Sequence, residues 1–481
     1  MDLSQVILVL VSISIPILMY LFRRKTRNGI NKEKIRTLPP GSTGLPFIGE
    51  SLTYLWKTQR GFQSEFFKER MEKYSSKIFK TGLFSQPIAV LCNAEGNKFL
   101  FANEGKLVKL WMSSKLDTVI PVSGKEPVAE HSKRLRSIVL PYFLKGDALR
   151  KQAGIMDAVM KQHLEKYWIG KDKVNISEMT KKYTLTLGWN IFLGITDSEE
   201  AERVLKGMEE VESAIIGARI NLPQFTLNPG IKAGEIMRSE IMEIIRQKKV
   251  DVSLNPDTEK DFISNMILGV EENGDFVNDE DIASYLLALL QAAYTSVHPT
   301  ICMLMKSLAE LPHVYQAVLK EQMDVASSKE PGSRLMWEDF RKMKYSWNVI
   351  CETLRLYSPG AGFKEAITDF TYEGYTIPKG WKIHWAGPAT HKDPKYFKNP
   401  EKFDPTRFEG DGPTPYTFVP FGGGPRMCPG NEYTRLVTLT FVHHVMINFR
   451  WEKLNPNEKI SNFPIAMPAQ GLPVRLYPRK T

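Results

Sequence analysis

The segment Phe418–Leu436 contains the residues whose types and spacing best predict chemistry. Its sequence, FVPFGGGPRMCPGNEYTRL, places Cys428 shortly after three glycines and two residues after Arg426. The glycines permit a sharp turn, and a helix is predicted to start after Pro429-Gly430. A thiol at a helix N-terminus, beside backbone N–H groups and a guanidinium, is held as the thiolate that binds metal. A cysteine in a Gly-rich loop can also be structural, so this prediction needs support elsewhere in the chain.

The same segment does not fit a nucleotide-binding loop. It lacks the Gly-Lys-Ser/Thr ending of a P-loop, and Met427 stands where a dinucleotide fingerprint requires its third glycine. A second pattern, Glu352-Thr353-Leu354-Arg355, puts opposite charges three residues apart on one helix face. If that pair is buried, a third group must satisfy it. Such pairs are common on helix surfaces, so the spacing alone predicts little.

Taken in order along the chain, three segments resemble the signatures of cytochrome P-450 monooxygenases. Phe421-x-x-Gly424-x-Arg426-x-Cys428-x-Gly430 resembles the haem-thiolate motif, and Glu352–Arg355 resembles the E-x-x-R helix. The segment FDPTRF resembles the one that supplies the third partner of this pair, here Arg407. The resemblance implies a mainly α P-450 fold with small β-sheets, in which haem b lies between a long central helix and the Cys-loop helix.

The resemblance also implies the roles of residues around the haem. Cys428 would be the axial thiolate ligand of the iron, a ligation that favours O–O cleavage. Phe421 and Arg426 would lie beside the ring, with Arg426 as the firmer partner of a haem propionate. Arg136 is a second propionate candidate, although Ser132 stands where the family often has tryptophan. Either arginine could instead be a surface charge.

The central helix departs from the family pattern at Gln291–Ser296. Members usually place an acid and then an alcohol here, which relay protons to iron-bound dioxygen; this chain has Thr295 and Ser296. Proton delivery is therefore predicted to use hydroxyls and water. Pro299 lacks an N–H, which leaves the Thr295 carbonyl unbonded four residues back. We hypothesise that this carbonyl and the Ser296 hydroxyl hold a relay water; the alternative is a kink tolerated for packing.

A narrower resemblance concerns the substrate. Segments such as PYTFVPFGGGPRMCPG and ITDFTYEGYTIPKGWKIHW resemble plant triterpenoid and sterol-type oxidases, which hydroxylate amyrin-type and dammarane-type skeletons. Small residues would leave room for a bulky, rigid, apolar substrate, although they also suit close helix packing. The predicted substrate-facing residues are Trp111, Ala292, Ala293, Gly360, Ala361 and Met467.

Hydrophobic periodicity predicts the elements that position these residues. Apolar residues recur at helical spacing over 65–74, 148–167, 198–217 and 231–250, while Pro87–Leu91 and Phe370–Trp385 alternate like short strands. Asn278 can cap a helix with an acidic first turn. Because Ile282–Leu311 is apolar all round, this helix must cross the interior.

The N-terminal residues form a separate unit. Val6–Phe22 is almost wholly apolar and, at about 1.5 Å per residue, spans roughly 25 Å of a thin bilayer. Basic residues follow it, so the positive-inside rule predicts a single-pass anchor with a cytosolic body. A cleaved signal peptide would carry its charge before the apolar run. The predicted organisation is an anchor over 1–22, a basic Pro-rich hinge over 23–50 and a catalytic domain over 51–481, in the endoplasmic reticulum membrane.

Composition limits the remaining choices. The 481 residues are 42% hydrophobic and 25% charged, which excludes disordered and collagen-like chains. The net charge of +10 fits a solvated basic surface, an acidic partner or membrane lipid, and no pattern indicates nucleic acid. Four scattered cysteines fit neither a disulfide scaffold nor a zinc site, and His298, His443 and His444 are interpreted as structural.

These observations leave three hypotheses. The first is a monooxygenase that receives NADPH electrons from a separate cytochrome P-450 reductase, because the chain has no nucleotide-binding fingerprint. The second is a haem-thiolate rearrangement or dehydration enzyme that needs neither O2 nor reductase, motivated by the missing acid. The third is a membrane-tethered protein that binds a ligand without haem.

Overall fold

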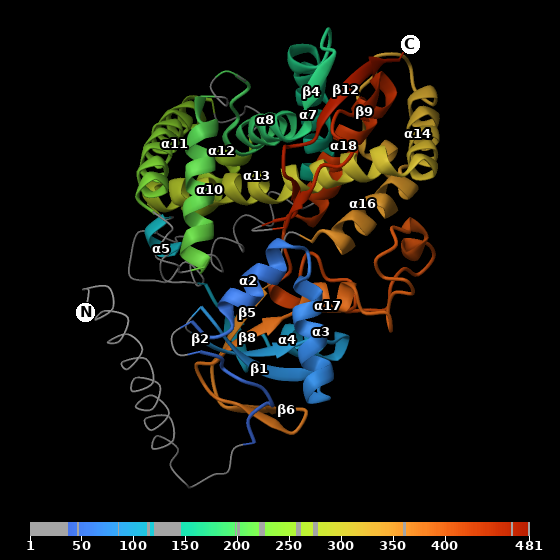
Figure 1. The fold of residues 1–481 in the computed structure, drawn as a ribbon. Helices are drawn as coiled ribbons and strands as arrows, with labels where there is room; N and C mark the ends of the chain where they lie inside the picture. Colours follow the sequence, from blue (N-terminus) through green and yellow to red (C-terminus); the bar gives the residue numbers. More distant parts are fainter. Residues whose placement is uncertain are drawn as a thin grey trace, which may run out of the picture.

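A computed structural model describes residues 37–45, 48–84, 86–112, 116–119, 146–197, 199, 203–220, 227–255, 261–272, 278–358, 362–462 and 465–479. The predicted anchor, most of the hinge, Arg136, Gly360 and Ala361 lie outside the described residues. Figure 1 shows a helical part, crossed by α13, next to a smaller part built on a β-sheet. The prediction of a mainly helical body with small sheets is confirmed.

The helical part contains most of the described helices, long and short. These are α5 (Leu116–Val119), α7 (Gly146–Tyr167), α8 (Ile176–Gly188), the π-helix η1 (Trp189–Leu193), α10 (Leu205–Ile220), α11 (Asn228–Leu254), α12 (Phe262–Glu272), α13 (Asp279–Glu310), α14 (Pro312–Ser327), α15 (Trp337–Phe340), α16 (Lys344–Leu356) and α18 (Asn431–Asn448). A sheet of order β4-β12-β9 borders them, formed by β4 (Lys173–Asn175), β12 (Pro473–Pro478) and β9 (Phe449–Lys453).

The sheet part has five strands in the order β1-β2-β8-β5-β3: β1 (Ile78–Leu83), β2 (Gln86–Leu91), β8 (Lys382–Trp385), β5 (Gly362–Ala366) and β3 (Val108–Leu110). Only β2 and β8 run parallel; the other pairs are antiparallel. Around it lie α2 (Ser51–Gln59), α3 (Gln63–Tyr74), α4 (Ala94–Ala102), α17 (Gly387–His391) and the hairpin of β6 (Phe370–Tyr372) with β7 (Tyr375–Ile377). A second hairpin, β10 (Ile460–Ser461) with β11 (Met467–Pro468), packs through β11 against α13.

Successive side chains along the strands of this sheet pack into two different buried clusters. Ile78 and Ala89 face one buried cluster, whereas their neighbours Phe79 and Val90 face another that includes residues of α3. Because successive strand side chains point to opposite faces, both sides of the sheet are covered. The sheet is therefore a rigid base for the segments that leave its ends.

The central helix α13 forms as its sequence predicts. Asn278 accepts a hydrogen bond from the Asp281 amide at 2.9 Å, and three acidic residues occupy the first turn, where the helix dipole favours them. Among the described residues, α13 is the helix whose length and composition would allow it to cross a membrane, but 72% of its most apolar stretch is buried. It is an interior helix, and it continues through Pro299.

Candidate active site

The Cys428 loop lies between α4 and the start of α18. Gly424 has φ +67°, and a Cβ there would lie 2.5 Å from the Phe101 carbonyl oxygen of α4, so only glycine allows this approach. The Cys428 amide donates to the Phe421 carbonyl at 2.8 Å, which closes the loop before α18 begins at Asn431. The predicted helix start after Pro429-Gly430 is confirmed.

The environment of Cys428 differs from that of the other cysteines. Cys92, Cys302 and Cys351 are buried, and desolvation raises the pKa of all three thiols, that of Cys302 to about 12. Cys428 is exposed and lies three residues before the N-terminus of α18. Thiolate character requires access and stabilised negative charge, so Cys428 is the thiol suited to bind metal.

A buried ion-pair cluster is connected to this loop through hydrogen bonds. Arg355 of α16 binds the Glu352 carboxylate at 2.7 and 2.8 Å, and both side chains have no exposed surface. The Arg407 guanidinium, in the 3-10 turn η2 (Pro405–Phe408), lies 3.4 Å from the same carboxylate. A backbone amide, that of Asp404, completes the acceptor capacity of Glu352 at 2.8 Å. The structure thus brings together the three residues that the sequence pattern selected.

One histidine connects that cluster to the Cys428 loop. The His391 carbonyl accepts from Arg355 at 2.7 Å, and its Nε2 accepts from the Val419 amide at 2.9 Å. His391 has no exposed surface, and burial lowers its pKa to about 3, with Arg355 acting in the same direction. A neutral ring can accept the amide bond, whereas a protonated one cannot. Sequence reasoning missed His391, because nothing nearby in the chain marks it.

A second charged cluster involves the predicted propionate partner Arg426. Its Nε lies 3.6 Å from the Glu104 carboxylate, which also accepts from Lys364 of β5 at 2.6 Å. The side chains of Glu104 and Lys364 are only 7% and 5% exposed. The sequence offered no signal for this pairing, because Glu104 and Lys364 come from distant segments.

The middle of α13 presents a polar, open strip. Ala292 is exposed and Ala293, Thr295 and Ser296 are partly exposed, although most of the helix is buried. The Ser296 hydroxyl donates to the Ala292 carbonyl at 2.7 Å, and the Gln291 amide donates to Thr295 Oγ1 at 2.9 Å. Ser296 therefore keeps its proton on the helix and offers lone pairs to the open side.

The other predicted substrate-facing residues lie on two segments. Trp111 follows β3, its amide donates to the Phe363 carbonyl at 3.2 Å, and the two rings pack edge to face. Met467 lies in β11, which packs against α13. Just before it, Ala466 lines a pocket at the end of α16 together with Ser358.

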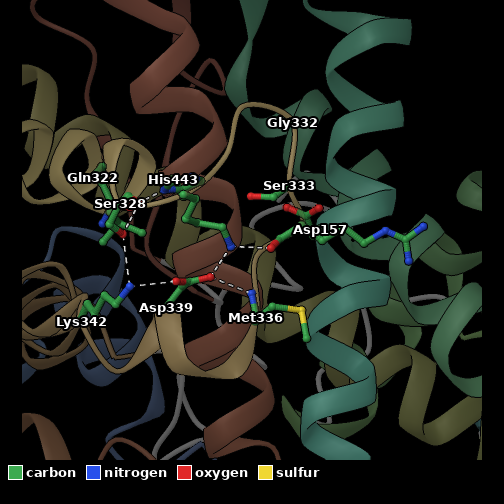
Figure 2. Close-up of polar contacts among 12 residues, drawn as sticks. Asp157, Gln322, Ser328, Gly332, Ser333, Met336, Asp339, Lys342 and His443 are labelled. Carbon is green, nitrogen blue, oxygen red and sulfur yellow. Dashed lines mark hydrogen bonds and ion pairs between the residues drawn. The ribbon is translucent and has the colours of Figure 1, made fainter.

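Two histidines of α18 bind side chains of neighbouring helices. His444 Nε2 lies 2.8 Å from Asp157 of α7, and His443 Nδ1 lies 2.9 Å from the Gln322 side chain of α14. Figure 2 shows His443 and Gln322 beside the contacts of Asp339, which accepts from the Met336 amide at 2.9 Å. The contacts hold α18 against its neighbours, in agreement with the structural interpretation of both histidines.

The donor set fits a haem and not a bare metal ion. Across the described ranges, no three His, Cys, Asp or Glu side chains come together as a metal site. Among the described residues, a thiolate at Cys428 would be one ligand of an iron whose remaining ligands come from another group, as in a porphyrin. Cys428 on one side and the open strip of α13 on the other are the residues that would face such a ring.

Comparison with known proteins agrees with this geometry. Residues 39–475 match the family described as Cytochrome P450. The chain is 47% identical over 461 residues to the β-amyrin 16-β-monooxygenase of Platycodon grandiflorus, covering 94% of this chain and 95% of that one. It is 44% identical over 481 residues to the β-amyrin 28-monooxygenase of Vitis vinifera, covering 99% of both.

A solved structure gives the same result for the fold. The retinoic-acid-bound cyanobacterial CYP120A1 superimposes with a TM-score of 0.79 at 26% identity, over 92% of this chain and 100% of that one. The haem and its cysteine thiolate ligand come with this family. The chain therefore belongs to the cytochrome P450 family.

Proposed function

We propose that this protein is a monooxygenase that hydroxylates an unactivated C–H bond of a triterpenoid of the amyrin or dammarane type. The single observation that carries the proposal is the exposed Cys428 thiol, held in a closed loop at the start of α18. The relatives named β-amyrin monooxygenases support the substrate class. They do not favour the alternative of a rearrangement or dehydration enzyme, because they are named as monooxygenases.

Each group of residues has a distinct task in this reaction. When bound, the haem supplies the reduction of dioxygen and the oxidation of the C–H bond, with electrons delivered from NADPH by a reductase. Cys428 would hold the iron, and the cluster of Glu352, Arg355 and Arg407 would fix the loop that positions it. Arg426 would balance the negative charge of a haem propionate. Its ion pair with Glu104 would then be weakened, because the guanidinium would be shared between the two carboxylates.

On the side of the haem opposite Cys428, small residues would leave room for the substrate, and polar residues would hold or move protons. Ala292 and Ala293 leave space along α13, and Trp111 and Met467 would bound the apolar substrate from the sheet part and from β11. Thr295 and Ser296 are the hydroxyls placed to hold or move a proton there. Arg136, Gly360 and Ala361 remain proposals from family position.

We further propose that residues 1–22 anchor the chain in the endoplasmic reticulum membrane and that 23–50 form the hinge before the catalytic domain. The apolar run Val6–Phe22 and the basic residues after it support this proposal. Microsomes treated with carbonate should retain the full chain, while a chain that starts at Lys34 should lose that tight association.

The function is tested by co-expression with a plant reductase and feeding of a triterpene panel that contains β-amyrin. We expect a hydroxylated product that requires NADPH and reductase, and a thiolate-type Soret band after reduction and CO treatment. Cys428→Ser should lose both, while Cys92→Ser should keep the band, because Cys92 is buried elsewhere. Turnover without reductase, or the band retained by Cys428→Ser, would contradict the proposal.

A further inference from the structure

The hairpin of β10 and β11 carries Met467, one of the predicted substrate-facing residues, to α13. The register of its two strands consists of two pairs, Ile460 with Pro468 and Ser461 with Met467. Met467 packs against the main buried cluster, to which α13 contributes, and β11 contacts α13 directly. Because a two-stranded hairpin on its own is marginally stable in water, other parts of the chain must hold it in place.

Glu458, just before β10, connects the two ends of this hairpin. Its Oε1 accepts from the Gln470 amide at 2.5 Å and from the Leu472 amide at 3.2 Å. Next to these bonds, the Ala469 amide donates to the Lys459 carbonyl at 2.8 Å. One side chain at the start of the hairpin therefore binds the backbone of the segment 469–472, which follows β11 and is called the return segment below.

The carboxyl group of Glu458 is used to bind backbone. The residue is 8% exposed, and one of its oxygens receives both amide bonds. The other oxygen, Oε2, is buried without a hydrogen-bond partner in the described structure. A buried polar atom without a partner costs free energy, and an apolar side chain would avoid that cost. What a glutamate provides at this position is thus the pair of amide bonds.

The return segment is also bound to the start of α8. The Gly471 carbonyl accepts from the Ser177 amide at 2.8 Å. The Leu472 carbonyl accepts from the Ile176 amide at 3.1 Å. Gly471 has φ +79°, and a Cβ there would lie 2.5 Å from Asn175 Oδ1, so this approach requires glycine. The return segment is therefore held both by α8 and by Glu458.

A displacement of the return segment would move Met467. Met467 lies three residues before Gln470, and the Gly471 amide donates to the Pro468 carbonyl at 3.0 Å, which closes a turn between them. Pro468 is buried, and its ring fixes φ, so this short stretch has little freedom to absorb a shift. The amide bonds of Glu458 consequently act on the position of Met467 against α13.

We propose that Glu458 is a positioning residue that determines which carbon of the triterpenoid is hydroxylated, because it holds Met467 and Ala466 in place beside α13. This inference rests on the proposed function and names a determinant of its selectivity. A rigid polycyclic skeleton has several C–H bonds of similar reactivity close together. A shift of about 1 Å in one wall of the site is therefore enough to change which bond reacts. Glu458 acts through the backbone of the return segment and does not touch the substrate.

The test compares two variants of the full-length, haem-loaded protein with reductase and β-amyrin. Glu458→Gln keeps the length and the oxygen acceptor, whereas Glu458→Asp keeps the carboxyl group but is one methylene too short to reach both amides. We expect Glu458→Asp to lower the ratio of the main hydroxylated product to its isomers about tenfold, and Glu458→Gln to keep it within about twofold of wild type. The matched control is Glu452→Asp on β9, where the side chain is 52% exposed; it should leave the ratio unchanged.

The product ratio separates positioning from a merely structural role. A variant that only folds or loads haem less well makes less product in total, but its intact molecules still give the wild-type ratio. The CO-difference band measures the loaded fraction, to which turnover is normalised. Titration with β-amyrin, followed by the shift of the Soret band, should show weaker binding for Glu458→Asp than for Glu458→Gln.

Hydrogen exchange tests the amide bonds without turnover. The Leu472 amide is buried and should exchange about 5- to 150-fold faster in Glu458→Asp, because it loses its acceptor, while Glu458→Gln should resemble wild type. Gly471→Ala is a second change in the same segment that leaves Glu458 intact. It should also shift the product ratio, because its Cβ would meet Asn175.

The outcomes distinguish this inference from the proposed function. If exchange of the return segment rises in Glu458→Asp but the product ratio stays at the wild-type value, the inference is overturned and the function stands. Equal shifts of the ratio in Glu458→Asp and Glu458→Gln would also overturn it, because the reach of the acceptor would then not matter. If Glu458→Asp does not load haem, an unchanged ratio in Gly471→Ala overturns the inference. Wild-type protein without NADPH-dependent product would instead refute the proposed function.

Discussion

Deleting the acceptor atom of His391 should loosen the Cys428 loop by a predictable amount. His391→Phe keeps a ring that can pack on Phe418, 5.5 Å away between ring centres, but leaves the buried Val419 amide without its 2.9 Å acceptor. An unsatisfied buried donor costs about 1–3 kcal/mol. Local opening of the loop should therefore rise about 5- to 150-fold.

The matching assay is hydrogen exchange of the Val419 amide, followed by mass spectrometry of peptides that cover the loop. His391→Gln should restore much of the protection, because its side-chain oxygen can reach the position of Nε2. The control is His163→Phe: His163 is also buried, but its Nε2 has no hydrogen-bond partner in the structure. Equal protection in His391→Phe and wild type, or equal loss in His391→Phe and His391→Gln, would refute the role assigned to the acceptor atom.

Three further predictions follow from buried charge, close approach and burial of histidine. Glu352→Gln should lower the free energy of unfolding by about 3–5 kcal/mol in urea titrations, because it leaves buried guanidinium groups uncompensated, while Glu69→Gln, whose side chain is 54% exposed, should change it by under about 1 kcal/mol. Gly424→Ala should fail to retain haem in absorbance spectra, because the new Cβ would meet the Phe101 carbonyl; Gly374→Ala, also at positive φ but with nothing within 4 Å, should retain it. Stability should fall as the pH drops below 6.5, because unfolding lets five buried histidines bind protons; urea midpoints that are constant from pH 7 to 5 would contradict this. The histidines, with pKa values lowered to about 3 or 4, are His163, His298, His384, His391 and His443.

Elements with strong local signals could be predicted from the sequence. The capped helix that starts after Asn278 is α13, and the helical periodicity of 231–250 lies within α11 (Asn228–Leu254). The alternating segment Phe370–Trp385 contains β6, β7 and β8. The helix predicted over 198–217 is described as α10 from Leu205 onward, with the residues before it largely outside the described ranges.

The site was predictable only where a family motif or one element carried it. Glu352 and Arg355 are one helical turn apart, so their pairing follows from helix geometry. His391 and Val419 are joined by a bond across 28 residues, and Glu104 and Lys364 by one across 260. No periodicity encodes such pairings, because they arise when separate elements pack.

The two sides of the proposed haem site respond differently to pH. On the side of Cys428, burial lowers the pKa of His391 to about 3, and that of His384 in the adjoining sheet to about 4. Both rings therefore stay neutral between pH 6 and 8, and the Val419 bond is unchanged over that range. On the side of α13, burial raises the pKa of Glu212 on α10 to about 7, so this carboxyl group changes charge in the same interval. Because His391 and His384 stay neutral, the spectrum of the thiolate-bound iron should stay constant when the pH changes from 6 to 8. A spectrum that changed between pH 6 and 8 would contradict the neutral state assigned to His391 and His384.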